Sequence, residues 1–281
     1  MCKAETNDLE KKMAARWKRL IPPSRPSKDY MALYEKYVLL EAEKKDKLTW
    51  GLLGCTPEIR SLAGKYQAEI LCIDNNPAAF PAFRLLCEPS KNEKFLCSDW
   101  LDVNLPEKFD VILGDGAVSM LPLEKHEALL NSIYKMLKPE GIALLRIHVI
   151  APSQFENPRQ IFDWYRENAA DKPVYYATKP HLNQFCLDPE TMKTNINLLQ
   201  NMIQNLYTDK IIDTEEFEAF EKLKDGSTEL QYTKKELFEQ IVAPYFKIEG
   251  IYYARDFPNG LNRPLYHLRK KTKKQFPVNE K

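Results

Sequence analysis

The chain has 281 residues, with 41 Lys and Arg against 40 Asp and Glu, 44% hydrophobic residues and 9 Gly. This length is enough to bury a large core, and the hydrophobic and aromatic content excludes a disordered chain. The balanced charge gives no overall field that would attract nucleic acid or a membrane surface, so neither is an expected partner. The low glycine count is the unusual number.

The sequence predicts a cytoplasmic protein without a membrane anchor. No apolar run approaches the roughly 18 residues that a spanning helix needs, and the charged start MCKAETNDLEKK lacks the apolar stretch of a secretory signal. The six cysteines form no C-x-x-C pair and the four histidines form no H-x-x-x-H pair. Reduced thiols are therefore expected, with neither a disulfide framework nor a metal site.

Helices and strands alternate in the first half of the chain. Apolar spacing predicts helices over residues 9–20 and 30–42, separated by a Pro-rich stretch at 21–27. Five short apolar strands follow, and the segments between most of them have helical spacing. The predicted strands are residues 48–54, 69–74, 94–100, 109–115 and 141–150, and the predicted helices are 57–66, 77–87 and 123–137. This alternation is typical of a parallel sheet covered on both faces.

Residues 151–230 interrupt that alternation with helical patterns at 157–169, 191–206 and 213–223. Asp213 and Glu216 have the spacing of a capping box, as do Thr233 and Glu236 before a helix that runs through Val242. Two final strands, 245–256 and 263–271, are predicted to form a hairpin around Pro258-Asn259-Gly260. The predicted fold class is α/β: a Rossmann-like, seven-stranded, mostly parallel sheet with an antiparallel final hairpin, N-terminal helices and a helical insertion.

The predicted organisation has five parts. They are an N-terminal helical cap (1–47), an α/β core (48–150), the helical insertion or lid (151–230), the C-terminal part of the core (231–271) and a basic tail (272–281). The tail belongs to the one strong charge run, Arg269 to Lys274, which is expected to be solvated.

Polar residues follow the predicted strands, where open α/β sheets bind ligands. The residues after the first four strands, and those on the fifth, are Gly54; Asp74 and Asn75; Ser98, Asp99 and Trp100; Asp115 and Gly116; and Arg146 and His148. A glycine lets the backbone approach a ligand, and an acid after the second strand can accept both hydroxyls of a ribose. A single Asp at a strand end is often a helix cap, but three acids beside a glycine turn are harder to explain in that way.

These residues resemble the motifs of the class I S-adenosylmethionine-dependent methyltransferases. The resemblance covers residues 48–150 and 231–271, and it includes the turn Leu137-Lys138-Pro139-Glu140-Gly141 before the fifth strand. The first motif of that family is acidic-x-Gly-x-Gly-x-Gly. Here it reads LLGCTPE, so only Gly54 is kept and Thr56 and Glu58 replace the other two glycines. The string resembles a Thr-Pro-Glu variant of the motif.

The resemblance implies that S-adenosylmethionine is the cofactor and that residues 48–150 bind it. Its methionine part would lie against Gly54, Cys55, Thr56, Pro57, Asp115 and Gly116, its ribose against Asp74 and Asn75, and its adenine against Ser98, Asp99 and Trp100. Arg25 would pair with its carboxylate and Tyr34 would pack on the sulfonium. The alternative for these last two is a surface arginine and a core tyrosine, and for Cys55 it is packing.

The predicted function is methyl transfer to a small-molecule acceptor under a helical lid, with an in-line displacement at the sulfonium methyl. His148 is the candidate general base, unless it is simply a strand residue with a satisfied ring. The lid aromatics would line an apolar pocket or form core. Three alternatives stay open: an aminopropyltransferase-like enzyme, an NAD-dependent enzyme on the same fold, and a non-catalytic cofactor-binding or scaffold protein. Neither the acceptor atom nor the oligomeric state follows from the residues.

Overall fold

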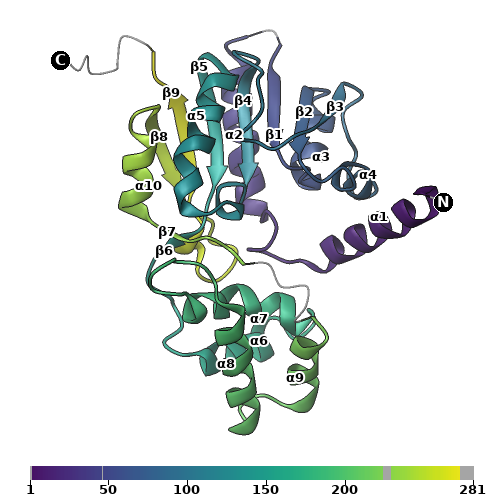
Figure 1. The fold of residues 1–281 in the computed structure, drawn as a ribbon, viewed down its shortest axis with the longest axis vertical. Coiled ribbons are helices and arrows are strands. Elements are labelled where there is room, and N and C mark those ends of the chain that lie inside the picture. The colour runs from purple at the N-terminus through teal and green to yellow at the C-terminus, as the bar shows by residue number, and fades with distance from the viewer. Residues whose placement is uncertain (1, 46, 224–228, 273–281) are drawn as a thin grey trace.

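A seven-stranded sheet in the order β3-β2-β1-β4-β5-β9-β8 forms the centre of the protein (Figure 1). The computed structural model describes residues 2–45, 47–223 and 229–272. The strands are β1 Thr49–Leu53, β2 Glu69–Asp74, β3 Glu93–Cys97, β4 Phe109–Asp115, β5 Leu137–Arg146, β8 Phe246–Tyr252 and β9 Leu265–Lys270. Only β9 runs against the others, because it pairs antiparallel with both β5 and β8. The predicted fold class is confirmed.

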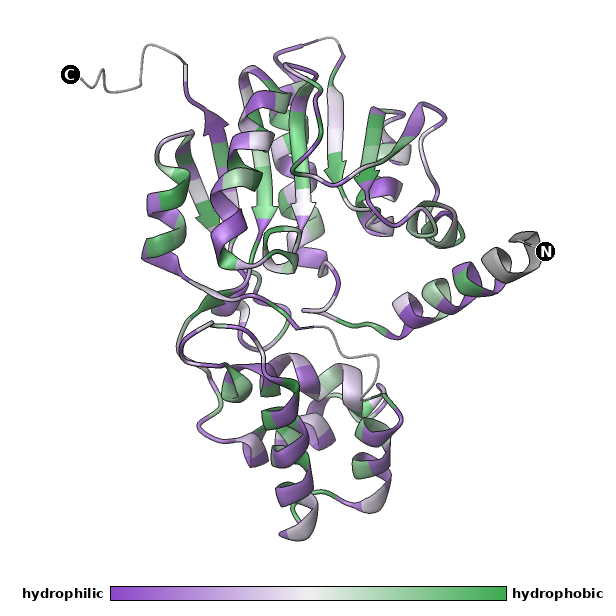
Figure 2. Cartoon of the chain, in the orientation of Figure 1, coloured by the Kyte–Doolittle hydropathy of each residue, from purple (hydrophilic) through white to green (hydrophobic). Residues whose placement is uncertain are grey.

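Helices cover both faces of the sheet and form two separate cores with it. Neighbouring residues of a strand point to opposite faces, so Leu52 packs in one core and Leu53 in the other. The helices on the first face are α2 Lys28–Ala42, α3 Pro57–Lys65 and α4 Ala79–Arg84; those on the second are α5 His126–Met136 and α10 Lys235–Val242. Figure 2 shows the matching pattern, with hydrophobic residues concentrated on the strands and hydrophilic stripes on the helices.

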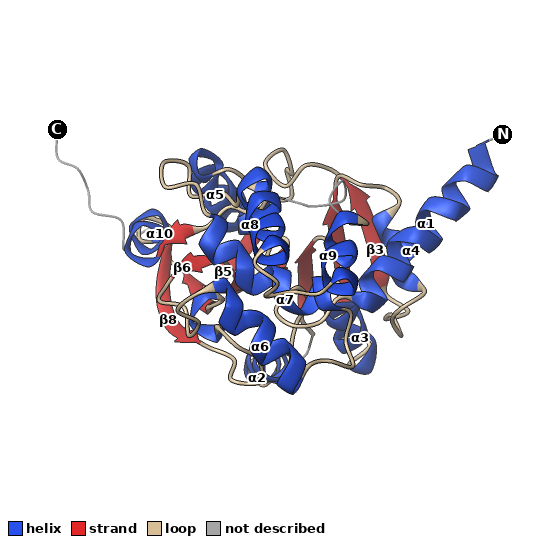
Figure 3. Ribbon diagram, turned by 90° about the horizontal axis from the view of Figure 1, so that it is seen from below, coloured by secondary structure: helices blue, strands red, loops and turns tan. Residues whose placement is uncertain are grey.

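The insertion is a helical unit with its own core, placed across the carboxyl ends of the strands (Figures 1 and 3). Its helices are α6 Pro158–Asn168, α7 Val174–Leu182, α8 Ile196–Thr208 and α9 Thr214–Glu221. The predicted capping box is present, because Asp213 accepts from the Glu216 amide and the Glu216 carboxylate accepts from the Asp213 amide. Helix α7 was not expected from the sequence, since it contains Pro180 and its aromatic residues lack clear helical spacing.

The junction between core and insertion differs from the sequence prediction. Strand β5 ends at Arg146 rather than residue 150, and a separate two-stranded sheet follows, in which β6 (Val149–Ile150) pairs with β7 (Thr233–Lys234). The predicted second capping box is wrong, because Thr233 is a strand residue whose hydroxyl donates to the carbonyl of Lys234. Pairing with a segment far away in the sequence replaced the local cap.

The predicted antiparallel pairing of the last two strands is confirmed, but the predicted tight turn between them is wrong. Residues 253–264 connect β8 to β9, and Asn259 takes a left-handed conformation (φ 59°) before a short 3₁₀ helix, Gly260–Asn262. The side chain of Asn259 accepts from the Gln154 amide at 2.9 Å and lies 3.3 Å from His181. The Asn-Gly pair therefore shapes a loop that contacts the insertion.

The N-terminal segment packs along the edge of the core next to the insertion. Helix α1 (Cys2–Arg19) contacts α4, and the Trp17 and Phe83 rings lie 4.9 Å apart. A turn with a cis Pro22–Pro23 bond follows, and Ser27 then caps α2 by accepting from the Tyr30 amide. Two helices joined by a Pro-rich turn therefore precede β1.

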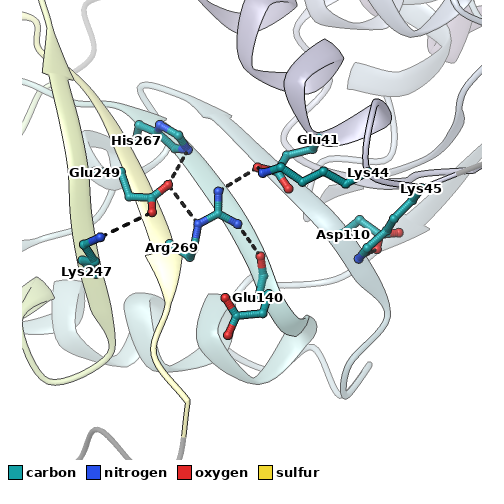
Figure 4. Close-up of polar contacts among 9 residues, drawn as sticks. All are labelled: Glu41, Lys44, Lys45, Asp110, Glu140, Lys247, Glu249, His267 and Arg269. Atoms are coloured by element: carbon teal, nitrogen blue, oxygen red, sulfur yellow. Dashed lines mark hydrogen bonds and ion pairs between the residues drawn. The ribbon is translucent and has the colours of Figure 1, made fainter.

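At the opposite end of the sheet, ion pairs hold α2 and the segment after it to the strands (Figure 4). Arg269 on β9 lies between Glu41 at 2.7 Å and Glu249 at 2.9 Å, and Lys45 contacts Asp110 at 2.6 Å. Arg269 and Lys270 are thus paired strand residues rather than part of a solvated run. Residues 273–281 of the expected tail lie outside the described residues.

Candidate active site

The turn after β1 lies directly against the end of β2. Gly54 has φ +96°, and its amide donates to the Ile73 carbonyl at 2.7 Å. A Cβ at this position would lie 3.8 Å from Asp74 Oδ2. Only a glycine adopts this backbone at little cost, which explains why this one glycine of the motif is kept.

The Asp74 carboxylate accepts a hydrogen bond from the backbone, and no described cation pairs with it. Its Oδ1 accepts from the Asn76 amide at 2.8 Å, and burial raises its pKa. Among the described residues no Lys or Arg forms an ion pair with it, and the neighbouring Asn75 is exposed. The carboxylate can therefore accept from two ribose hydroxyls, as the resemblance implies.

The residues after β3 are tied more closely to the protein. The Trp100 indole donates to the Ile73 carbonyl at 2.6 Å, and its ring packs on the core beneath α5. Asp99 accepts from the Leu101 amide at 3.0 Å, while Ser98 donates its amide to the Asp74 carbonyl at 3.1 Å. These contacts fix the loop beside Asp74, and they show Trp100 as a packing residue in this structure.

Asp115, at the end of β4, is held by a buried arginine. Arg146 on β5 contacts both of its oxygens, at 2.5 and 2.8 Å, and each side chain is 3% exposed. Burial disfavours the charge of Arg146, but the Asp115 carboxylate raises the pKa of the guanidinium overall. The same guanidinium donates to the Pro23 carbonyl at 2.8 Å. This pair therefore fastens the N-terminal segment to the strand ends.

The two N-terminal candidates also have partners within the protein. Arg25 pairs with Glu58 at the start of α3, and the Trp17 indole contacts the same carboxylate at 3.2 Å. Tyr34 is fully buried, and its hydroxyl lies 3.3 Å from Asp115. In this structure Tyr34 is a core residue, the alternative that the sequence left open, and Arg25 is a link between the N-terminal segment and the variant motif.

The remaining residues of the variant motif are buried. Cys55 and Thr56 are 3% and 6% exposed, and Pro57 is the first residue of α3. Cys55 packs in the core together with Cys72. Cys55 is therefore a packing residue, as the alternative reading expected. The turn offers mainly backbone atoms to a ligand.

A cavity of about 370 Å³ opens at the carboxyl ends of β4 and β5, between the core, the N-terminal segment and the insertion. This volume is in the range of small-molecule sites. Asp115, Gly116, Arg146 and His148 line it from the core; Trp17 and Pro23 from the N-terminal segment; Tyr175, Tyr176, Lys179 and Asn183 from the insertion; and Arg263 from the loop before β9. Gly116 has φ +78° and open space where a Cβ would be.

His148 lies in the cavity wall and is buried. Its backbone amide donates to the Ser119 hydroxyl at 2.9 Å, and Nδ1 has no hydrogen-bond partner. Burial lowers its pKa well below the usual value, and the charges of Arg263 and Arg146 add to this. The ring is therefore neutral and can hydrogen-bond a ligand, although a low pKa makes it a weak base.

Arg263 and Lys179 are among the cavity residues that the sequence did not predict. Arg263 precedes β9, and because β9 runs antiparallel its first residues, not its last, lie at the ligand-binding edge. Applying the strand-end rule to the reversed strand would have found it. Lys179 comes from α7, a helix with no clear sequence signal.

The strand-end turns fit S-adenosylmethionine better than they fit a metal. Gly54 and Gly116 both have positive φ beside adjacent strands, and Asp74 keeps acceptor capacity between them and the β3 loop. Within the described ranges no group of three or more His, Cys, Asp or Glu could hold a metal ion.

No helix over these residues is long and apolar enough to cross a bilayer.

Comparisons with known proteins bear on the family and the fold. Residues 53–141 match the family model of a methyltransferase domain. A structure from Rhodobacter sphaeroides, described as a zinc-dependent alcohol dehydrogenase, superposes with a TM-score of 0.59 at 13% identity over 96% of this chain and 100% of that chain. The PH0226 protein of Pyrococcus horikoshii gives 0.54 at 14% identity over 91% and 99%.

A third structure, the CurJ carbon methyltransferase, gives a TM-score of 0.51 at 10% identity over 86% of this chain and 54% of that chain. No curated protein that was compared matches the chain. At these identities the structural likenesses show the fold alone. Residues 53–141 therefore match a methyltransferase domain, within a chain that has a Rossmann-like α/β fold.

Proposed function

We propose that this chain transfers the methyl group of S-adenosylmethionine to a small organic acceptor held in the cavity between the core and the helical insertion. The observation that carries the proposal is the position of that cavity. It begins at Asp115 and Gly116, where the family resemblance puts the methionine part of the cofactor, and it extends to the aromatic residues of α7.

Different residues of the chain would bind different parts of the cofactor. Gly54 lets the β1 turn approach the cofactor, and Asp74 accepts from its ribose. The bound cofactor supplies a methyl group on a sulfonium, and the protein supplies orientation. Holding the acceptor in line with that methyl group accounts for much of the acceleration in such reactions.

The insertion would act as a lid that excludes water and selects the acceptor. Tyr175 and Tyr176 face the cavity from α7, and both are at most 6% exposed. A largely apolar wall favours an organic acceptor of modest size over a nucleic acid.

We also propose a cytoplasmic location, because the described cysteines from Cys55 to Cys186 are all unpaired thiols.

Calorimetry tests the cofactor half of the proposal. S-Adenosylhomocysteine should bind, and Asp74→Ala should weaken it about 10- to 100-fold, since hydrogen bonds to a charged acceptor contribute about 1.5–3 kcal/mol each. Asp209→Ala, an exposed acid at the end of α8, is the matched control and should bind like the wild type. No binding at millimolar concentration, or an unchanged Kd in Asp74→Ala, would refute the assignment.

A further inference from the structure

Apart from Asp115 and its partner Arg146, the charged side chains among the described residues that line the cavity are all cations. We propose that the methyl acceptor carries an anionic group, a carboxylate on an otherwise apolar or aromatic body, and that Arg263 and Lys179 bind it. This inference rests on the proposed function and names its substrate class.

Arg263 is a buried charge, and no carboxylate of the described residues pairs with it. It is 2% exposed, and its guanidinium donates to the Asn262 and Pro180 carbonyls at 3.0 and 3.3 Å and to the Tyr232 hydroxyl at 2.7 Å. Its Nε–H has no hydrogen-bond partner, and burial lowers its pKa. A buried arginine ordinarily pairs with a carboxylate, because an uncompensated charge away from water costs several kcal/mol.

Lys179 brings a second positive charge to the same wall. Its ammonium lies 5.9 Å from the centre of the Tyr175 ring, and no described carboxylate forms an ion pair with it. Burial and the neighbouring Arg16 lower its pKa to about 8, while Cys186 acts in the opposite direction. A lysine whose charge is disfavoured in the free protein gains most from an anion placed beside it.

The acids of the site do not offset these charges. Asp115 is the one carboxylate among the described residues that line the cavity, and both its oxygens are engaged by Arg146. Arg16 also lines the cavity, from α1. The neutral His148 ring, with Nδ1 unpartnered, can add a hydrogen bond without adding charge.

The rest of the wall fixes the other half of the acceptor. Apolar and aromatic side chains dominate the remaining lining, including Trp17, Leu20, Phe83, Met120, Tyr175 and Leu230. A neutral apolar molecule would leave Arg263 without a counter-charge, and a cationic molecule would be repelled. An apolar acid satisfies both parts of the cavity, because its carboxylate can accept from the unpartnered Nε–H of Arg263 and from the Lys179 ammonium.

Matched pairs of acids and amides test the charge preference directly. The probes are 1-naphthoate against 1-naphthamide, indole-3-acetate against indole-3-acetamide, and 4-hydroxybenzoate against 4-hydroxybenzamide. Affinities are measured by calorimetry or ligand-detected NMR, with and without saturating S-adenosylhomocysteine. In at least one pair we expect the acid to bind about 10-fold more tightly than its amide, since one charge-assisted hydrogen bond is worth at least that ratio.

Variants then assign the preference to the two cations. Lys179→Gln should reduce the acid-to-amide ratio about 5-fold or more and leave amide binding unchanged, whereas Lys179→Arg should keep the ratio. Arg263→Gln should abolish it, provided that circular dichroism shows a folded protein. Lys135→Gln, at an exposed site on α5, is the control and should change nothing.

The failures of the two proposals are distinguishable. If no acid of the panel binds more tightly than its amide, or if Lys179→Gln leaves the ratio unchanged, the inference is overturned. If S-adenosylhomocysteine does not bind at all, the methyltransferase proposal fails, and the acid-to-amide comparison without it still decides the charge preference.

Discussion

Replacing Asp115 by asparagine separates a structural role from a ligand-binding role. In the structure its carboxylate makes two hydrogen bonds to Arg146, and both side chains are 3% exposed. Asp115→Asn keeps the shape but leaves the Arg146 charge buried without a partner. Breaking such a pair costs about 3–5 kcal/mol in free energy of unfolding. At roughly 2–3 °C per kcal/mol for a chain of this size, Tm should fall by about 6–15 °C.

Guanidinium unfolding followed by circular dichroism measures that cost. The double variant Asp115→Asn/Arg146→Met removes the orphaned charge and should recover at least half of the lost stability. Asp163→Asn removes an exposed carboxylate on α6 and should change the unfolding free energy by less than about 1 kcal/mol. If Asp115→Asn costs less than about 1 kcal/mol, the pair is not an anchor, and the carboxylate is free for the amine of the cofactor.

Three further outcomes are expected. Gly54→Ala should weaken S-adenosylhomocysteine binding and cost about 1–2 kcal/mol in unfolding free energy, because φ is +96° there and the new methyl would face Asp74; equal binding in calorimetry would contradict this. Asp110→Asn should cost about 2 kcal/mol at pH 7. Burial disfavours the charged Asp110 carboxylate, but hydrogen bonds from lysine and threonine hold its pKa below the usual range. The carboxylate therefore stabilises the fold above about pH 4, and this stabilisation is lost as the pH falls further. The difference from wild type in urea titrations should therefore shrink towards pH 2, and a constant difference would contradict it. Glu58→Gln should speed limited proteolysis near residues 20–27, because it removes the Arg25 ion pair, with under about 1 kcal/mol lost in global stability; an unchanged cleavage rate would refute the link.

The fold was predictable because its signals are local. Strands such as 109–115 are short apolar runs bounded by turns, and Gly54, Asp74 and Asp115 end three strands whose carboxyl ends must share one edge of a parallel sheet. The capping box of Asp213 and Glu216 is likewise complete within four residues. Each of these features depends on neighbours in sequence or on a general rule of sheet geometry.

What the sequence did not predict depends on pairing between distant segments. Thr233 has the spacing of a cap, but it joins β6 in a ladder that no local pattern indicates. The Arg25 side chain pairs with Glu58, and Arg146 reaches Pro23, so these partners become visible only once the N-terminal segment is placed. The cationic wall was missed for the same reason, since Lys179 and Arg263 belong to separate parts of the chain.

The reversed direction of β9 has a consequence for how this protein can change over time. The turns that we propose to face the cofactor lie within residues 53–116, whereas Lys179 and Arg263 belong to the insertion and to the loop before β9. These two groups belong to separate segments of the chain, so a substitution in one changes no residue of the other. Selection for a new acceptor can therefore act on the later segments while the earlier turns are conserved, and chimaeras exchanged at residues 151–230 and 253–264 follow the same boundary.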